Sequence, residues 1–373
     1  MTRAHRRRET ALALAAVLVG LVILPAPPGS GVEGGFAQLD RYAALTQAQA
    51  QRMKQAHPAL ELQVMDASPA RVVSWWAAKD RKHQRALIRS SPALVGNLDG
   101  VDYASRDAAN RRQLRAELRT EREAVAAHPD DADARDRLTA LTAIRDALKP
   151  EARAGGHAEP RRWLVSLSHR DPPLAAIAVG DLDTARQVTF TVPGMGTYTD
   201  DMQLWTETAQ NVFDAQASIG APTAHAVVAW IGYRTPPPGV DATLGDYAER
   251  GAPLLASEIA GLQAARHGGE AVWGRLSRQD PRAPGFGATV ISVDGDPARG
   301  LLPVTTHAPV LHSSWNDDPD SRAWTTIRDP AQRAAEFAAH EKTYGYLDAG
   351  TESLRNAAIA TTPHATARLD AAG

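Results

Sequence analysis

The chain has no cysteine among its 373 residues, which excludes disulfides, thiolate zinc sites, cysteine nucleophiles and lipid attachment at an N-terminal cysteine. Its formal net charge is only −2, so no chain-wide field attracts nucleic acid or anionic lipid. No G-x-x-x-x-G-K-[ST] loop is present for nucleotide phosphates. His307 and His312 lie near aspartates, but their spacing matches no metal-ligand pattern, and we interpret this stretch as a solvated loop. The sequence therefore predicts no nucleic-acid partner, no metal and no cofactor.

The N-terminus carries a long apolar run behind a basic segment. MTRAHRRRET precedes ALALAAVLVGLVILPA, Ala11 to Ala26, and PPGSGVEGG then breaks any helix. This order is typical of an export signal. The run is short for a transmembrane helix, which needs about 17–25 residues, and no A-x-A cleavage site follows. We predict a signal peptide or signal anchor over residues 1–35, and hence an exported protein that is secreted or membrane-anchored and faces outside.

Residues 36–155 are predicted to form a helical region, because helix formers dominate and strand patterns are absent. We expect one helix over about Pro69 to Ile88, one after Asp107, and one after HPDDADA, whose aspartates suit a loop and a capped start. The stretch Arg106 to Glu123 mixes both charge signs and is interpreted as a solvated helix face. The segment Glu151 to Pro160 reads as a linker.

Short apolar runs follow from Arg161. The first three are closely spaced, as hairpins or a meander would be, and the fourth follows a helix; the runs are WLVSLS (163–168), LAAIAV (174–179), VTFTV (188–192) and AHAVVAWIGY (224–233). A strand–helix–strand order predicts a parallel crossover between the third and fourth runs. A long helix over Leu244 to Arg266 and a last strand over Ala288 to Val293 complete the pattern.

The stretch TFTVPGMGTYTDDMQLW, Thr189 to Trp205, combines a strand, a glycine turn and a helix start capped by Thr199 or Asp200. Such a turn can hold a phosphate, hold an oxyanion or simply reverse the chain. A dinucleotide fingerprint would need a glycine at Thr199 and an acid after the next strand, which instead ends in Tyr233-Arg234. The nucleotide interpretation is therefore disfavoured.

Several segments resemble the actinobacterial α/β-hydrolase-like domain of unknown function. They are VSWWAAKDRKHQRALIRSSPALVGNLDGVDYASRDAANRRQL, VPGMGTY, VVAWIGYRTPPP, AERGAPLLASEIAGLQA, DPRAPGFGATVIS and HEKTYGYLDAGTESLRNAA. The resemblance implies an α/β fold: a helical N-terminal region, then an incomplete hydrolase-like sheet with flanking helices over residues 156–373.

The resemblance also implies a site. The loop after the third strand, with Gly194, Met195 and Gly196, would supply backbone donors to an oxyanion. His340 matches the likely base, and Asp294 is a weak candidate for the orienting acid. The implied chemistry is serine hydrolysis of an ester, lipid or related acyl substrate.

The nucleophile is missing from this pattern. A G-x-S-x-G elbow should follow the Leu244–Arg266 helix, yet no serine in the chain has these flanks; Ser257 lies within a helix, Ser277 in a charged loop and Ser292 within a strand. We predict an inactive or weakened hydrolase. The alternatives are an active serine esterase or lipase with an unrecognised nucleophile, a non-catalytic cell-envelope binding protein, or a deletion product without function.

The missing segment also has a physical consequence for the sheet. Loss of a strand–helix–strand unit leaves open strand edges and bare apolar faces. Reduced stability, or reliance on a protein partner, is therefore expected.

Overall fold

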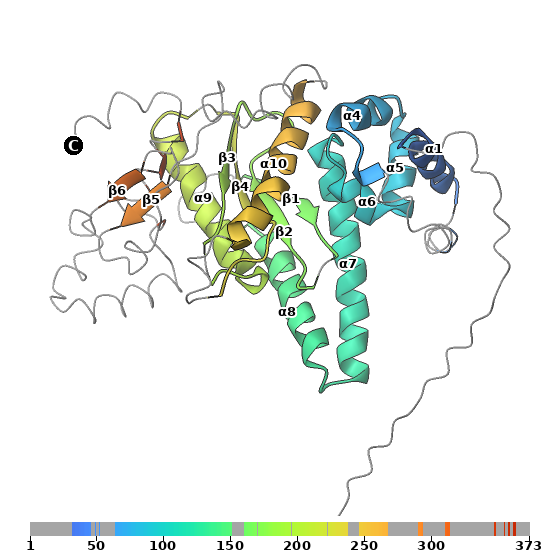
Figure 1. Cartoon of the computed structure of the whole chain (residues 1–373), viewed down its shortest axis with the longest axis horizontal. Coiled ribbons are helices and arrows are strands. Elements are labelled where there is room, and N and C mark those ends of the chain that lie inside the picture. The colour runs from blue at the N-terminus through green and yellow to red at the C-terminus, as the bar shows by residue number, and fades with distance from the viewer. Residues whose placement is uncertain are drawn as a thin grey trace, which may run out of the picture.

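The computed structural model describes residues 32–45, 49, 52, 64–150, 160–169, 171–194, 196–221, 223–237, 246–267, 290–293, 310–313, 347, 354, 357, 358, 361 and 362. A helical N-terminal region precedes a small mixed sheet with flanking helices, as predicted (Figure 1). The N-terminal helices are α1 (Val32–Ala43), α4 (Pro69–Ala77), α5 (Arg81–Ser90), α6 (Pro92–Asn97), α7 (Tyr103–Ala127) and α8 (Ala132–Ala147).

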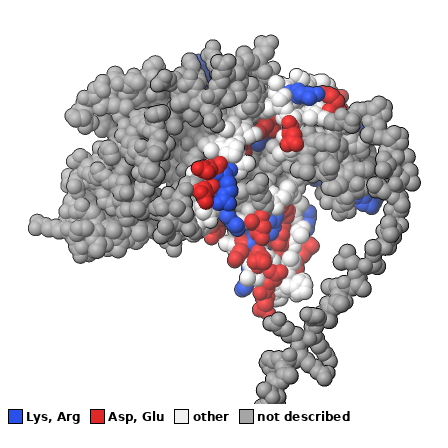
Figure 2. Space-filling model, in the orientation of Figure 1, with Lys and Arg blue, Asp and Glu red and all other residues white. Residues whose placement is uncertain are grey.

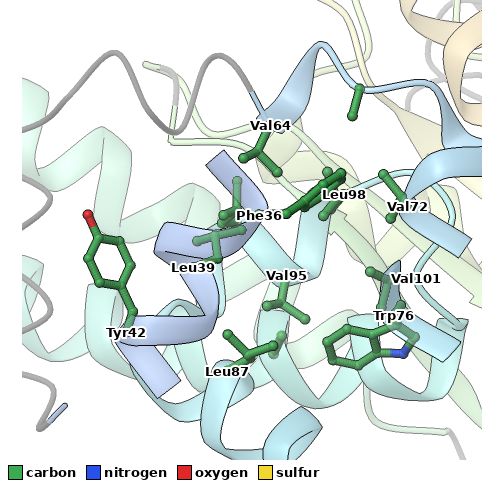
Figure 3. Packing of buried hydrophobic residues seen from close by; sticks show 13 residues of the cluster. Phe36, Leu39, Tyr42, Val64, Val72, Trp76, Leu87, Val95, Leu98 and Val101 are labelled. Atoms are coloured by element: carbon green, nitrogen blue, oxygen red, sulfur yellow. The ribbon is translucent and has the colours of Figure 1, made fainter. Parts of the chain in front are cut away.

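Helices α1, α4, α5 and α6 share one hydrophobic cluster. Figure 3 shows its side chains converging between these helices, among them Phe36, Leu39, Val72, Trp76, Leu87, Val95 and Leu98. The prediction of a single helix over Pro69 to Ile88 is wrong, because α4 ends at Ala77 and a separate helix, α5, follows it. The Asp80 carboxylate accepts a hydrogen bond from the His83 backbone N–H at 2.7 Å and starts α5.

Helix α7 begins at Tyr103, earlier than predicted, because two carboxylates cap it. Asp102 accepts from the Ser105 N–H at 2.8 Å. Asp183, 80 residues beyond Tyr103 in the sequence, accepts from the N–H groups of Tyr103 and Ala104 at 2.8 and 2.9 Å. Helix α8 begins after Asp131, as the aspartate-rich loop predicted.

The solvated face predicted over Arg106 to Glu123 is wrong for its first turns. The side chains of Arg106 and Asp107 are each only 1% exposed. The far end of the α7–α8 hairpin does carry mixed charge at the surface, where Figure 2 shows acidic and basic side chains intermingled. Charged side chains in the buried half of α7 instead form hydrogen bonds with the first strand of the sheet.

The sheet contains all four predicted strands, within about two residues of the predicted bounds. They are β1 (Arg162–Leu167), β2 (Ala175–Val179), β3 (Gln187–Thr191) and β4 (His225–Ile231), in the order β1-β2-β4-β3. Strands β1 and β2 form the expected antiparallel hairpin. The parallel β3–β4 crossover is confirmed, through η1 (Thr199–Asp201) and α9 (Met202–Ser218). A meander of the first three strands is wrong, because β4 lies between β2 and β3.

Alternate residues of each strand face two different helix layers. Ile177 and Ile231 pack with α8 on one face, where Val227 and Ala229 pack with α9. Val228 packs toward α10 (Asp246–His267) on the other. The cluster that contains Ile177 and Ile231 joins residues of α7 and α8 to the sheet, so one hydrophobic core crosses the predicted domain boundary after residue 155. Its members include Leu114, Leu118, Leu141, Ile144, Leu164, Leu167 and Ile177.

A second, two-stranded parallel sheet consists of β5 (Val290–Val293) and β6 (Val310–Ser313). Strand β5 matches the last predicted strand, whereas β6 was not predicted: His312 lies in a strand rather than in the loop inferred from the sequence. Among the described strands, none pairs with the outer edge of β3. No helix in the described part of the chain is both long and apolar enough to cross a membrane; residues 11–26 lie outside that part.

Candidate functional site

A cavity of about 350 Å³ opens at the carboxyl ends of the parallel strands β3 and β4. Ligands of open α/β sheets bind at this edge, where the loops after successive strands diverge. Its wall is lined by the apolar residues Ala140 of α8, Leu174, which directly precedes β2, and Ile231 of β4. Its mouth is polar, with Asp136, Asp171, Asp200 and Arg234 around it. The cavity thus offers an apolar wall behind a charged rim.

The loop that follows β3 forms one side of this cavity, through Thr197 and Tyr198. Gly196 has φ +77°, in the left-handed region where residues with a Cβ are strained. Its N–H donates to the Pro236 carbonyl at 3.0 Å. The glycine predicted from the sequence is therefore needed for the backbone path of this turn.

The three residues predicted to form the oxyanion loop differ in their surroundings. Gly194 is exposed, and its N–H makes no hydrogen bond with another described residue. Met195 lies outside the described residues. The Gly196 N–H is already committed to Pro236, so Gly194 is the described donor left for a ligand. The oxyanion role itself remains a prediction.

The helix after this loop starts differently from the prediction of a Thr199 or Asp200 cap. A short 3₁₀ turn precedes α9, and the Asp201 carboxylate accepts from the Tyr198 N–H at 2.9 Å. Thr199 is buried instead of capping the helix. Asp201 is the N-cap residue of α9 by position, but its side chain makes no capping hydrogen bond to that helix.

The catalytic roles of His340 and Asp294 remain predictions, because both residues lie outside the described part of the chain. Ser257, on α10, donates its hydroxyl to the Asp99 carboxylate at 2.7 Å. No serine is among the described residues that line the cavity.

The charged network that lies behind the cavity was not predicted from the sequence. Arg137, which lines the cavity, donates to Glu121 at 2.9 Å and to Glu117 at 3.3 Å. Glu117 also lies 2.6 Å from His169 Nδ1 and accepts from Gln113. Burial raises the pKa of Glu117, but the hydrogen bonds from His169 and Gln113 and the charge of Arg137 outweigh it, so the pKa lies below its usual value.

No sequence signal pointed to this network, because His169 and Glu117 are far apart along the chain and belong to different elements. Its ion pairs hold Arg137 against α7, and Arg234, the other cation among the described residues that line the cavity, is exposed. Within the described residues, no group of three or more histidine, aspartate or glutamate side chains is arranged to hold a metal.

Comparisons with known proteins place this region in context. Residues 169–273 match the model of a family described as alpha/beta hydrolase. Two uncharacterized proteins of Mycobacterium tuberculosis, from strains CDC 1551 / Oshkosh and H37Rv, are each 28% identical to the chain over 209 residues. The match covers 50% of this chain and 32% of each relative, so the chain matches about a third of the length of these relatives. No solved structure matches the chain.

Proposed function

This chain carries an actinobacterial alpha/beta-hydrolase-like domain of unknown function, and from that premise we propose that it binds the acyl group of an ester or lipid and hydrolyses it weakly or not at all. The binding site would be the cavity at the carboxyl ends of β3 and β4. The ester carbonyl would face the Gly194–Gly196 loop, and the acyl chain would lie along Ala140, Leu174 and Ile231.

One observation carries the binding proposal: an apolar-walled cavity adjoins the loop after β3. Its volume of about 350 Å³ is in the range of small-molecule sites. The polar rim would accept the alcohol side of the ester, while burial of methylene groups against the wall would supply affinity, about 0.8 kcal/mol for each.

Weak or absent hydrolysis is supported by the missing nucleophile. Acyl transfer by this fold needs a serine on a sharp strand-to-helix turn beside the oxyanion donors. The sequence contains no G-x-S-x-G, and no serine lines the described cavity wall. The commitment of the Gly196 N–H to Pro236 further reduces the number of free donors.

Blocking the cavity tests the binding proposal. Thr139 is exposed on α8 and lines the cavity, so Thr139→Phe should fill it without disturbing the core. We expect methyl octanoate, followed by calorimetric titration, to bind the Thr139→Phe variant at least about tenfold more weakly. Thr120→Phe, at an exposed position of α7, is the matched control and should bind like the wild type. Equal binding by both variants would place the ligand elsewhere.

A fluorophosphonate probe separates the catalytic alternatives. We expect no stoichiometric labelling of the full chain. Labelling at a single serine, lost after heat denaturation, would instead establish an active serine esterase or lipase with an unrecognised nucleophile. Ester binding without labelling or turnover would support a non-catalytic binding protein, and neither binding nor labelling would favour a deletion product without function.

The N-terminal pattern supports a site of action in the cell envelope. A basic segment followed by the apolar run Ala11–Ala26 would export the chain, or anchor it, with the cavity outside the cytoplasm. Fractionation of expressing cells tests this location. Recovery of the intact, full-mass chain in the soluble cytoplasmic fraction would contradict it.

A further inference from the structure

The loop after β3 is held by the segment that follows β4. Tyr233 donates its hydroxyl to the Pro193 carbonyl at 2.7 Å. Thr235 donates its hydroxyl to the Thr197 carbonyl at 2.6 Å, and the Gly196 N–H donates to Pro236 at 3.0 Å. These three bonds join residues that are 38 or 40 positions apart in the sequence, as the parallel crossover requires.

We propose that Tyr233 and Thr235 are positioning residues, which hold Pro193 and Thr197 on either side of Gly194 so that the Gly194 N–H can meet the carbonyl oxygen of a bound acyl group. This inference rests on the proposed function of that loop. Neither side chain is needed to touch the reacting atoms. Each acts on a carbonyl of the loop backbone.

The Tyr233 ring is fixed independently of its hydroxyl. It stacks on Trp230, with ring centroids 5.8 Å apart. It also packs against α10 at Gly251, where an added Cβ would lie 2.8 Å from the ring. Burial raises the pKa of Tyr233, so its hydroxyl stays protonated and remains a donor. These packing contacts therefore fix the position of the ring, and with it the position of the hydroxyl that donates to Pro193.

Thr235 secures the other end of the loop. The residue is only 2% exposed, so water competes poorly for its hydrogen bond. Pro193 and Thr197 are thus held on either side of Gly194, while Gly196 takes the left-handed conformation between them. Fixed donors are effective in oxyanion sites because they need no reorganisation when charge develops.

Amide hydrogen exchange measured by NMR tests this inference, with the Gly196 N–H as reporter. Thr235→Val removes the hydroxyl and keeps the side-chain shape, and Tyr233→Phe keeps the ring. We expect each variant to speed exchange at Gly196 by about three- to tenfold, the worth of one neutral hydrogen bond. Thr235→Ser should restore the wild-type rate. Thr120→Val, which removes a hydroxyl bonded to the Ala116 carbonyl in α7, is the matched control.

The outcomes separate this inference from the proposed function. Unchanged exchange at Gly196 in both variants would overturn the positioning role. Equal acceleration at every amide would also overturn it, because the two hydroxyls would then contribute to global stability rather than to the loop. Methyl octanoate titration is read in parallel, and Thr235→Val should weaken binding about three- to tenfold. If the wild type binds no ester while Gly196 responds, the proposed ligand fails and the restraint of the loop stands. If the ester binds and Thr235→Val changes neither measurement, only the positioning role fails.

Discussion

The Asp107 carboxylate accepts a hydrogen bond from the backbone N–H of Leu164 at 2.8 Å and so joins α7 to the first strand of the sheet. Arg111 and Arg161 donate to the same carboxylate, each at 2.7 Å. An aspartate predicted to lie just before a helix is therefore the acceptor on which helix and sheet converge.

Asp107→Ala should destabilise the protein by about 3 kcal/mol, because it leaves a buried N–H and two guanidinium groups without their acceptor. The urea midpoint measures this loss. Asp130→Ala, at an exposed position of the α7–α8 loop, should change the stability by less than about 0.5 kcal/mol. Similar midpoints for the two variants would show that Asp107 is dispensable.

Two glycines with nearly the same backbone angle should respond differently to alanine. Gly180 has φ +93°, and an added Cβ would lie 2.6 Å from the His225 carbonyl oxygen. Gly220 has φ +91°, with nothing within 4 Å of that position. Gly220→Ala should cost about 1–2 kcal/mol from the left-handed conformation alone. Gly180→Ala should lower the stability by at least about 2 kcal/mol more than Gly220→Ala, because the backbone at His225 must move to make room for the added Cβ. Thermal unfolding of both variants measures the difference, and equal losses would contradict the close approach of β2 and β4.

Stability should fall as pH rises from about 4 to about 7, because of Glu258 on α10. Burial raises the pKa of Glu258 to about 7, although Arg106, 3.6 Å away, opposes the shift. In the unfolded chain this carboxyl titrates near a pKa of about 4.3. The folded protein therefore binds the extra proton between these values, and the stabilisation is complete below about pH 4 and lost as pH passes about 7.

Glu258→Gln is neutral at every pH and should remove this dependence. We expect it to be more stable than the wild type by about 1–3 kcal/mol at pH 8, with a smaller difference at pH 5. Glu249→Gln, at an exposed position of the same helix, should follow the wild-type curve. Parallel curves for Glu258→Gln and the wild type would contradict the raised pKa of this largely buried carboxyl.

Local patterns were sufficient to predict the elements that bury a continuous apolar face. The four strands of the main sheet and the helices α9 and α10 all follow from runs of apolar residues and their turn signals. The crossover between β3 and β4 followed from chain order alone. The turn after β3 was also placed correctly from its glycines, and in the structure Gly196 takes the left-handed conformation there.

Contacts between distant residues could not be predicted in this way. The position of β4 between β2 and β3 depends on pairing across the sheet, not on spacing along the chain. Arg106 and Asp107 look like surface residues of a charged helix until Gly96, Asp99 and Leu164 supply their partners. The pairing of His169 with Glu117 likewise exists only after α7 packs on the sheet.

The hydrophobic core that α7 and α8 share with the sheet decides where the chain can be divided. A fragment starting at residue 156 would strip the cover from Leu164, Leu167 and Ile177 and would delete the helix terminus that Asp183 caps. Such a fragment should be insoluble when expressed alone, whereas one that begins ahead of α7 keeps both layers of this core. Limited proteolysis should accordingly spare α7 and β1 themselves long after exposed termini have been trimmed.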